Sequence, residues 1–249
     1  MIQRQNQMLE IVNQEGKIDV NSLAERVGVS AVTVRKDLDA LAEMGLLIRE
    51  HGYALRMGSD DINNRLAVKY EIKAQIAKKA ASFVRPGETV MIESGSSCAL
   101  LAGELAGKKD VTIITNSAFI AGYVRDKGSA RIVLLGGEYQ RESQVMVGPL
   151  VRTCARSFHV DKLFIGVDGF DPEYGFSTSD MMRTDAMKGM AQSAEKLFVL
   201  TDSEKFSHPG LIMELAFEDV YAVITDDEIP SKARQILQAQ NIQVITPGM

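Results

Sequence analysis

The sequence predicts an α/β fold in which a small helical N-terminal region precedes a larger region built on a parallel sheet. Residues 1–57 carry three apolar patterns of helical period and end in a short hairpin pattern. From residue 73 to residue 249, runs of Val, Ile and Leu alternate with helical stretches, which is typical of parallel strands buried on both faces. Residues 58–72 lie between these regions and begin with a polar, Gly- and Asn-rich stretch, so we expect a linker there.

Composition and charge exclude several classes of protein. Apolar residues make up 45% and charged residues 24% of the chain, which is typical of globular rather than disordered proteins. No apolar run approaches the roughly 20 residues that span a bilayer, and no secretory signal is recognisable, so we expect a cytoplasmic protein without a membrane partner. The two cysteines form no CxxC motif and the three histidines lack metal-ligand spacing. We therefore expect no metal site and no cofactor.

The first helix is expected to carry a buried stripe and to end at a glycine. The stripe consists of Met8, Ile11 and Val12. Gly16 fits the C-cap, because glycine adopts the left-handed conformation without steric cost. A short extended segment, residues 18–20, follows this helix.

A tight turn separates the second helix from the third. Asn21 is a suitable N-cap for the second helix, residues 22–27, and Ser30 is a suitable N-cap for the third. Gly45 is expected to end the third helix. Its apolar face is formed by three residues at helical spacing: Val34, Leu38 and Leu41.

Two strands, residues 46–49 and 53–56, are expected to flank a turn at residues 50–52. Three helices followed by such a two-stranded wing describe a winged helix-turn-helix. In these domains the third helix enters the major groove of DNA, with apolar residues toward its own domain and basic residues toward the groove.

The third helix has a polar face opposite its apolar one. At 100° per residue, Val32, Arg35, Lys36 and Asp39 point away from the apolar face. The alternative is an ordinary solvated face, because residues 1–57 hold seven Arg and Lys against eight Asp and Glu. The DNA-binding interpretation requires that the basic groups be sorted onto one face. Its candidate contacts, with those of the wing, are Ser30, Ala31, Thr33, Arg35, Lys36, Arg49 and His51.

Seven strands are expected in the second region, at residues 89–93, 111–115, 131–135, 163–167, 197–201, 221–225 and, more weakly, 243–246. The stretches between them suit crossover helices, for example residues 99–106 and 118–127. Polar or glycine-rich segments follow five of these strands. Open α/β sheets bind ligands at this edge. The five segments are residues 93–97, 115–117, 136–139, 168–169 and 202–205.

One of these segments has the pattern of an anion site. Residues 94–97, Ser-Gly-Ser-Ser, offer small side chains and backbone N–H groups at the start of a helix, which suits a phosphate. Lys205 can add a positive charge, and Asp202 can accept from sugar hydroxyls. The alternative is that such loops only cap and turn, but five of them at one edge favour a ligand site.

An ordered series of motifs runs through nearly the whole chain. It begins with Val-Ser-Ala-Val-Thr-Val-Arg-Lys-Asp-Leu at residues 29–38 and resembles the signature of the DeoR family of bacterial transcriptional regulators. It continues through Leu41, Gly45, Ile48-Arg49, His51-Gly52, Arg65, Lys73, Gly87, Thr115-Asn116, Gly136-Gly137, Gly148-Pro149, residues 166–169 and residues 202–206. Tyr53 departs from the pattern, since many members have a second glycine there.

The resemblance implies a repressor of carbohydrate-metabolism genes that a phosphorylated sugar releases from operator DNA. It also implies a Rossmann-like effector domain similar in fold to ribose-5-phosphate isomerases and glucosamine-6-phosphate deaminases. We further expect a homo-oligomer, because small DNA-binding modules gain specificity as symmetric pairs. The implied effector-binding residues are Glu93, Ser94, Gly95, Ser96, Ser97, Thr115, Asn116, Gly137, Asp168, Asp202 and Lys205. Three of these depart from the usual family residues: Glu93, Ser96 and Ser97.

An enzyme of sugar-phosphate isomerisation is the alternative. Residues 168–171, Asp-Gly-Phe-Asp, resemble the DGxD motif of ribose-5-phosphate isomerases, where two carboxylates can share proton transfer. However, residues 176–179, Phe-Ser-Thr-Ser, stand where those enzymes have a Gly-rich loop with a lysine. The N-terminal helix-turn-helix pattern also has no role in that reading, so we expect a regulator and not an enzyme.

Overall fold

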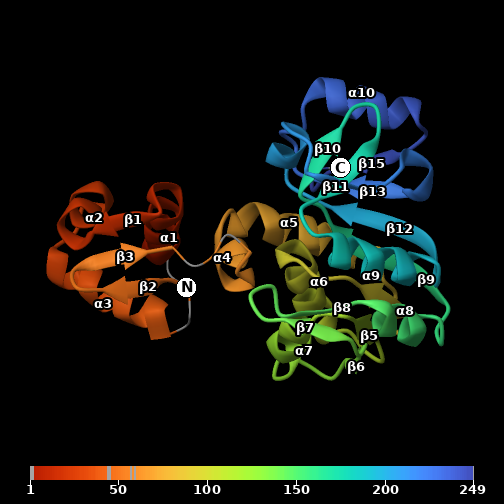
Figure 1. Cartoon of the computed structure of the whole chain (residues 1–249), viewed down its shortest axis with the longest axis horizontal. Helices are drawn as coiled ribbons and strands as arrows, with labels where there is room; N and C mark the ends of the chain where they lie inside the picture. Colours follow the sequence, from red (N-terminus) through yellow and green to blue (C-terminus); the bar gives the residue numbers. More distant parts are fainter. Residues whose placement is uncertain (1–2, 44–45, 57, 59, 249) are drawn as a thin grey trace. The chain divides into compact units, whose positions relative to one another are not determined.

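The computed structural model describes residues 3–43, 46–56, 58 and 60–248 (Figure 1). The chain divides into two compact units, Met1–Tyr70 and Glu71–Met249. We call the first unit the head and the second the sensor unit. No helix in the described part of the chain is long and apolar enough to cross a membrane.

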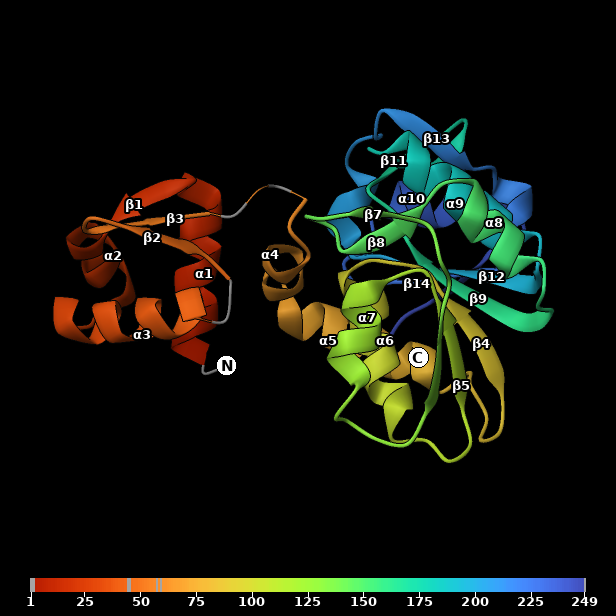
Figure 2. The ribbon, with the colours of Figure 1, turned by 60° about the horizontal axis from the view of Figure 1, so that its bottom comes forward.

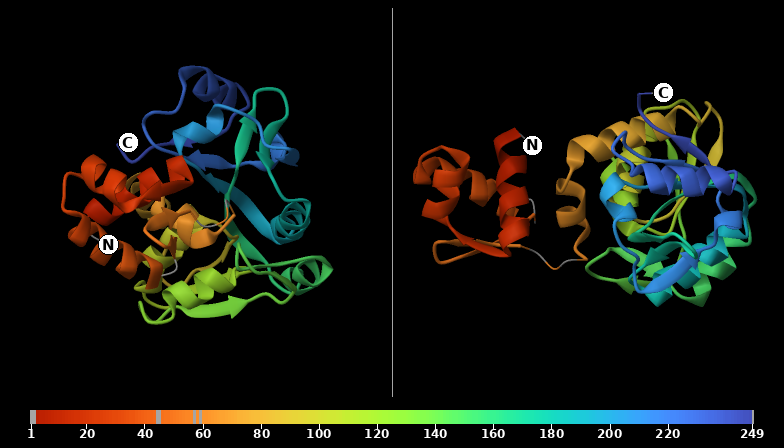
Figure 3. Two further views of the ribbon diagram at one scale, coloured as in Figure 1. Left: turned by 60° about the vertical axis from the view of Figure 1, so that its left-hand side comes forward. Right: turned by 90° about the horizontal axis from the view of Figure 1, so that it is seen from above.

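The head contains the three expected helices and a small antiparallel sheet, seen from two further sides in Figure 3. The sheet has three strands in the order β1-β3-β2, so the wing that was expected to have two strands gains β1 as a third. Its core is formed by apolar side chains of all three helices, including Met8, Leu23 and Leu38. The elements are α1 (Gln3–Glu15), β1 (Lys17–Asp19), α2 (Val20–Val27), α3 (Ala31–Glu43), β2 (Ile48–Glu50) and β3 (Tyr53–Leu55).

The helix ends of the head follow their predicted residues with one exception. Gly16 has a φ of +74° and donates its N–H to the carbonyl of Val12, as a C-cap does. Ser30 accepts the N–H of Thr33, as predicted for an N-cap. The predicted N-cap of α2 is wrong, because Asp19 and not Asn21 accepts the first free N–H groups of that helix. Gly45, expected to end α3, lies outside the described residues.

A helix occupies part of the range 58–72 that we expected to be a linker. This helix is α4 (Ile62–Ala67), and Asp61 caps it by accepting two backbone N–H groups. Ala67 packs into the core of the head, which explains why this polar segment is helical. The next helix, α5 (Tyr70–Ala81), begins within the same range. Ser59 in this range and Met57 just before it lie outside the described residues.

The sensor unit is built on a seven-stranded parallel sheet in the order β15-β14-β12-β9-β4-β5-β6. The seven strands predicted from the sequence are the seven strands of this sheet, with shifts of at most three residues at their ends. They are β4 (Thr89–Ile92), β5 (Thr112–Thr115), β6 (Arg131–Leu134), β9 (Val160–Gly166), β12 (Ala194–Leu200), β14 (Ala222–Ile224) and β15 (Gln243–Ile245).

Helices cover both faces of this sheet (Figure 2). One face carries α5, α6 and α7, and the Sγ of Cys98 on α6 lies 3.8 Å from the carbonyl oxygen of Phe164 on β9. The opposite face packs against α8, α9 and α10 through one continuous apolar cluster. The helices not yet bounded are α6 (Ser96–Ala106), α7 (Ala118–Val124), α8 (Pro149–Ala155), α9 (Met181–Ala191) and α10 (Ser231–Ala239).

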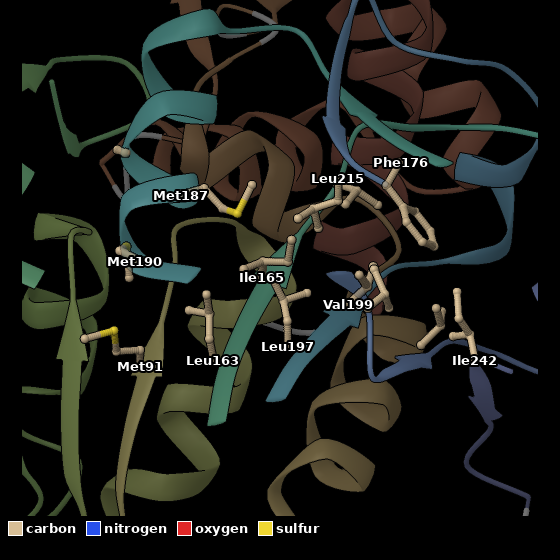
Figure 4. Close-up of a cluster of buried hydrophobic side chains, with 14 of the residues drawn as sticks. Met91, Leu163, Ile165, Phe176, Met187, Met190, Leu197, Val199, Leu215 and Ile242 are labelled. Atoms are coloured by element: carbon tan, nitrogen blue, oxygen red, sulfur yellow. The ribbon is translucent and has the colours of Figure 1, made fainter. Parts of the chain in front are cut away.

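Two smaller sheets, which the sequence did not predict, complete the sensor unit. The hairpin of β7 (Glu138–Gln140) and β8 (Val145–Val147) follows β6. The other sheet joins β10 (Gly169–Asp171), β11 (Gly175–Thr178) and β13 (Ile212–Leu215) in antiparallel order. Figure 4 shows its Phe176 and Leu215 beside the apolar side chains of β9 and β12. Two 3-10 turns, Ser203–Phe206 and Phe217–Asp219, lie near β13 in the chain.

The order of the strands creates a switch point between β4 and β9. From β4 the chain runs outward through β5 to β6, and from β9 it runs outward in the opposite direction through β12, β14 and β15. Open parallel sheets bind ligands where the strand order reverses, in the crevice beyond the carboxyl ends of the strands. The segments after β4 and β9 are therefore the first place to look for a ligand site.

Candidate functional site

The outer face of α3 carries the side chains that the helical spacing predicted. Val32, Arg35, Lys36 and Asp39 are exposed, whereas Val34, Leu38 and Leu41 are buried in the core of the head. Asp37, by contrast, is buried and accepts a 2.7 Å hydrogen bond from Arg4. The exposed basic pair is thus presented on one face of the helix.

Two predicted contact residues organise the first turn of α3. The hydroxyl of Ser30 accepts the N–H of Thr33 at 3.2 Å and lies 2.9 Å from the Thr33 hydroxyl. Ser30 is exposed, and Ala31 and Thr33 are half-buried. A helix that reads DNA contacts base edges mainly through residues near its N-terminus. The first turn of α3 is therefore the part of the helix from which we expect base contacts.

Val32 is the residue on this face that the candidate contacts omitted. Its relative exposure of 73% is unusual for a large apolar residue of the head. The sequence did contain a signal, because an aliphatic side chain at the start of a polar helix face has no partner in its own domain. Apolar side chains in the major groove contact the methyl group of thymine.

The wing is fastened to α3 by an ion pair. Arg49 on β2 donates from Nη1 to the carboxylate of Asp39 at 2.8 Å and to the carbonyl of Arg35 at 3.2 Å. This bond holds the predicted phosphate contact Arg49 against the C-terminal half of the recognition helix. A phosphate contact by Arg49 stays a prediction.

The tip of the wing is a two-residue turn. His51 and Gly52 both have positive φ angles, 27° and 88°, and Glu50 pairs with Tyr53 on either side of them. Two successive positive φ values match the twist of a two-residue hairpin. The turn leaves His51, the other predicted wing contact, exposed to solvent.

The predicted effector residues lie where the strands of the sensor unit end. Glu93 to Ser97 follow β4, and Asp168 follows the adjacent β9. Asp202 and Lys205 follow β12, the next strand beyond β9. The sheet thus brings residues from three neighbouring strands to one edge, on both sides of the switch point.

The loop between β4 and α6 keeps the geometry of an anion site. Gly95 has a φ of +116°, and a Cβ built there would meet no heavy atom within 4 Å. No side chain caps the first turn of α6 among the described residues. The first N–H groups of a helix have no partner within the helix, and together with the helix dipole they favour an anion. Ser94 donates to Glu93 at 2.6 Å and so fixes the carboxylate beside this loop.

Three predicted residues at or just after the ends of β5 and β6 make contacts within the protein framework. Thr115 accepts the N–H of Ser117 at 3.1 Å, and the amide nitrogen of Asn116 donates to the carbonyl of Met146 at 3.0 Å. A Cβ on Gly137 would lie 2.7 Å from the carbonyl oxygen of Val147. These contacts hold the β7–β8 hairpin. The buried Oδ1 of Asn116, which has no hydrogen-bond partner among the described residues, is the atom of this group that suits a ligand.

The two carboxylates of the Asp-Gly-Phe-Asp motif have different environments. Asp168 accepts through Oδ2 from the hydroxyls of Thr178 and Ser179 and from the N–H of Ser179, at 2.8 to 3.2 Å. Asp171 accepts the N–H groups of Glu173 and Tyr174 and so caps the turn between β10 and β11. Asp171 therefore serves a structural turn, whereas Asp168 is held beside the end of β11.

The segment after β12 presents an acceptor and a cation. Asp202 caps the 3-10 turn that follows by accepting the N–H of Glu204 at 3.2 Å. Lys205 is half-buried, and its ammonium group has neither a hydrogen bond nor an ion pair with any residue that the structure describes. A half-buried cation without a protein partner suits a phosphate.

Glu214 and Arg183 are two site residues that sequence reasoning missed. Burial raises the pKa of Glu214 well above its usual value, and the charges of Glu93 and Asp168 raise it further, while Arg183 and Lys188 act in the opposite direction. The neutral form of Glu214 is therefore favoured. Arg183 is a buried residue of α9, and its Nε lies 3.8 Å from Asp180. Glu214 had no sequence signal because β13 was not predicted, and Arg183 lies on α9, away from the polar segments that follow the predicted strands.

A winged helix-turn-helix with an exposed basic helix face, joined to an α/β unit with a candidate anion site at its switch point, is the architecture of a ligand-responsive transcriptional regulator. Two domain families match the chain in the same order. The DeoR-like helix-turn-helix domain matches residues 4–59, and the DeoR C terminal sensor domain matches residues 68–227. The chain belongs to the DeoR family of transcriptional regulators.

Individual relatives are similar over nearly the whole chain. The putative aga operon transcriptional repressor of Escherichia coli O157:H7 is 29% identical over 99% of this chain and 94% of its own length. The glycerol-3-phosphate regulon repressor of Escherichia coli K12 is 28% identical over 97% of each chain. Ribose 5-phosphate isomerase A from Methanocaldococcus jannaschii matches 55% of this chain and 54% of its own, with 20% identity and a TM-score of 0.39. That likeness concerns the fold alone.

Proposed function

We propose that this regulator represses carbohydrate-metabolism genes and leaves its operator when a phosphorylated sugar binds the sensor unit. The observation that carries the proposal is the convergence at one sheet edge of an uncapped helix N-terminus, the carboxylates of Asp168 and Asp202, and the unpartnered ammonium group of Lys205. The N-terminus of α6 and Lys205 supply positive potential for a phosphate. The carboxylates supply acceptors for hydroxyl groups.

The functions named for the two relatives support the carbohydrate assignment. One is a repressor of the aga operon and the other a repressor of the glycerol-3-phosphate regulon. The second name supports a phosphorylated compound as the signal. We extend to this chain only the class of ligand, because Glu93, Ser96 and Ser97 depart from the residues usual in the family.

Release from DNA requires that the ligand bind one arrangement of the protein more tightly than the other. We propose that the protein acts as a homo-oligomer, because paired heads read two half-sites and a single small head binds weakly. The ligand then changes how readily two heads engage one operator. No chemical step is needed for this role, and the separate uses of Asp168 and Asp171 agree with a binding site rather than an active site.

A ligand screen tests the proposal directly. The full-length protein is heated with glucose 6-phosphate, ribose 5-phosphate, glycerol 3-phosphate and the corresponding unphosphorylated compounds. A ligand that binds only the folded state raises the melting temperature, and we expect this for a phosphorylated member only.

Calorimetry then compares the wild type with Lys205→Ala, for which we expect binding weaker by about 1.5–3 kcal/mol, the usual contribution of a charged hydrogen bond. Lys232→Ala, an exposed lysine of α10, is the matched control. Stabilisation by no sugar phosphate would overturn the proposal.

A further inference from the structure

Glu214 occupies a β-bulge in the sheet beside the switch point. Phe176 of β11 pairs with Leu215 of β13, and the next residue, Ser177, pairs with Met213, so Glu214 is the extra residue of its strand. Gly175 permits the close approach of the two strands, because a Cβ there would lie 2.5 Å from the carbonyl oxygen of Leu215. A bulge redirects the side chain of the extra residue and is common beside functional sites.

The carboxyl group of Glu214 is buried without a hydrogen bond. The residue is 5% exposed, and its Oε2 is buried with no hydrogen-bond partner among the described residues. Such a group is costly to bury, because it gives up its bonds to water and gains none from the protein. The neighbouring residue Leu215 packs into the apolar core (Figure 4). The stability of the fold therefore does not require a polar side chain at position 214.

The surroundings of Glu214 place its carboxyl group at the predicted effector site. The charged groups that act on it are Glu93, Asp168, Arg183 and Lys188. Glu93 follows β4 and Asp168 follows β9, which are the two strands that flank the switch point. Arg183 and Lys188 come from α9, whose apolar side chains belong to the same cluster as Phe176 of β11 and Leu215 of β13. Asp168 donates its backbone N–H to the carbonyl oxygen of Ser177 at 2.9 Å, and Ser177 pairs with Met213, the residue before Glu214. The backbone therefore ties the bulge that carries Glu214 to the carboxyl end of β9.

We propose that Glu214 binds the sugar portion of the effector by exchanging a hydrogen bond with one of its hydroxyl groups. This inference rests on the proposed function. A neutral carboxyl group has one donor and one strong acceptor, as a hydroxyl group does, so the two can pair without bringing charge into a buried site. The anion loop and Lys205 hold the phosphate, and Glu214 distinguishes a sugar from a bare phosphate.

Calorimetry on full-length variants tests this division of labour. The probes are inorganic phosphate, glucose 6-phosphate, ribose 5-phosphate and glycerol 3-phosphate. Glu214→Met removes the polar group at similar volume, and we expect the best sugar phosphate to bind about three- to tenfold more weakly, the equivalent of one neutral hydrogen bond. Inorganic phosphate should bind as in the wild type. Glu214→Gln keeps a donor and an acceptor in the same shape, so its sugar-phosphate affinity should stay near that of the wild type.

Lys205→Ala is the reciprocal control, since it should weaken inorganic phosphate and sugar phosphates by the same factor. The melting temperature of ligand-free Glu214→Met should equal or exceed that of the wild type, because an unpaired buried carboxyl is replaced by an apolar group. If that variant does not fold, Glu214→Asp, which shortens the side chain, should show the same selective loss.

The outcomes separate the two levels of the proposal. Equal sugar-phosphate affinity in the wild type and in Glu214→Met, or in Glu214→Asp where that variant is used, would overturn the role of Glu214 alone. A loss in Glu214→Gln as large as that in Glu214→Met would also overturn it. If the wild type binds none of the sugar phosphates, the proposed function fails, and the role of Glu214 fails with it.

Discussion

The guanidinium group of Arg49 on the wing donates a 2.8 Å hydrogen bond to the carboxylate of Asp39 on the recognition helix. The same nitrogen donates to the carbonyl of Arg35 at 3.2 Å. This pair joins the wing to the helix that bears the basic face. It also occupies the carboxylate of Asp39, which lies on that face beside Arg35 and Lys36, whereas Glu43, one turn further along the helix, is the other exposed carboxylate of the face.

Removal of Asp39 should therefore strengthen binding to DNA of any sequence. In Asp39→Ala, Arg49 is released and can reach a phosphate, so we expect severalfold tighter binding. The logarithm of the binding constant should also fall more steeply with the logarithm of the salt concentration, by about 0.9 in slope. Exposed ion pairs contribute little to stability, so the melting temperature should change little. A filter-binding titration at several salt concentrations measures both quantities. Asp126→Ala, which breaks the exposed pair with Arg125 in the sensor unit, is the control. An unchanged salt slope would mean that Arg49 stays on the helix or never meets DNA.

Removal of the basic pair should abolish specific binding. Each base contact made by Arg35 or Lys36 is worth about 1–3 kcal/mol of discrimination against the wrong base. In Arg35→Ala/Lys36→Ala we expect a preferred duplex, obtained by in vitro selection with the wild type, to bind no better than random DNA. Arg26→Ala removes an exposed charge of α2 that pairs with Glu15, and should leave the preference intact. Retention of the wild-type preference by the double variant would exclude this helix face as the reader.

Val32 should contribute a preference for thymine. An exposed aliphatic group at the first turn of a reading helix can contact the C5-methyl group, which deoxyuridine lacks. For the wild type we expect one thymine of the selected duplex whose replacement by deoxyuridine weakens binding. In Val32→Ala that replacement should have no further effect. Competition gel shifts with singly substituted duplexes provide the measurement. If every thymine can be replaced without loss in the wild type, Val32 does not read DNA in this way.

A half-buried carboxyl group, that of Glu88, and a buried one, that of Glu214, should give stability opposite dependences on pH. Burial alone would raise the pKa of Glu88, but hydrogen bonds from the Lys162 ammonium and the Arg85 N–H outweigh it, so its pKa lies below the usual value. Its contribution to stability is therefore present above the unfolded pKa and is lost as the pH falls. The raised pKa of Glu214 has the reverse effect: its contribution is present at low pH and is lost as the pH rises above the unfolded value.

Urea unfolding at a series of pH values distinguishes these cases. Glu88→Gln should be less stable than the wild type near neutral pH and approach it in acid. Glu214→Gln should gain stability relative to the wild type as the pH rises above about 4.3, the usual pKa of glutamate. Parallel pH profiles for the wild type and both variants would contradict these pKa assignments.

The architecture was predictable because its signals are local. Apolar runs such as residues 111–115 mark buried parallel strands, and the spacing of Val34, Leu38 and Leu41 fixes which face of α3 is outward. The polar segments followed the strands, and parallel strands bring their carboxyl ends to the same edge. The edge of the candidate site could therefore be named without knowing the strand order.

What the sequence did not predict depends on contacts between distant residues. Asp19 and Asn21 are both good helix caps two positions apart, and only the packed head decides between them. The four residues of β13, Ile-Met-Glu-Leu, include three good helix formers, so their local pattern does not indicate a strand. The burial of Glu214 there follows from a register shift against β11 that no local pattern encodes. The pairing of Arg49 with Asp39 likewise requires the fold of the wing.

The central claim is that a sugar phosphate in the sensor unit controls binding of DNA by the head. Fluorescence anisotropy of the full-length protein on its selected duplex, with and without a saturating sugar phosphate from the ligand screen, tests this most directly. We expect the dissociation constant for DNA to rise by about tenfold or more with the ligand, within the usual range of allosteric coupling. Lys205→Ala should bind DNA normally and resist release at the same ligand concentration. A wild-type protein that binds the sugar phosphate but holds DNA with unchanged affinity would contradict the claim.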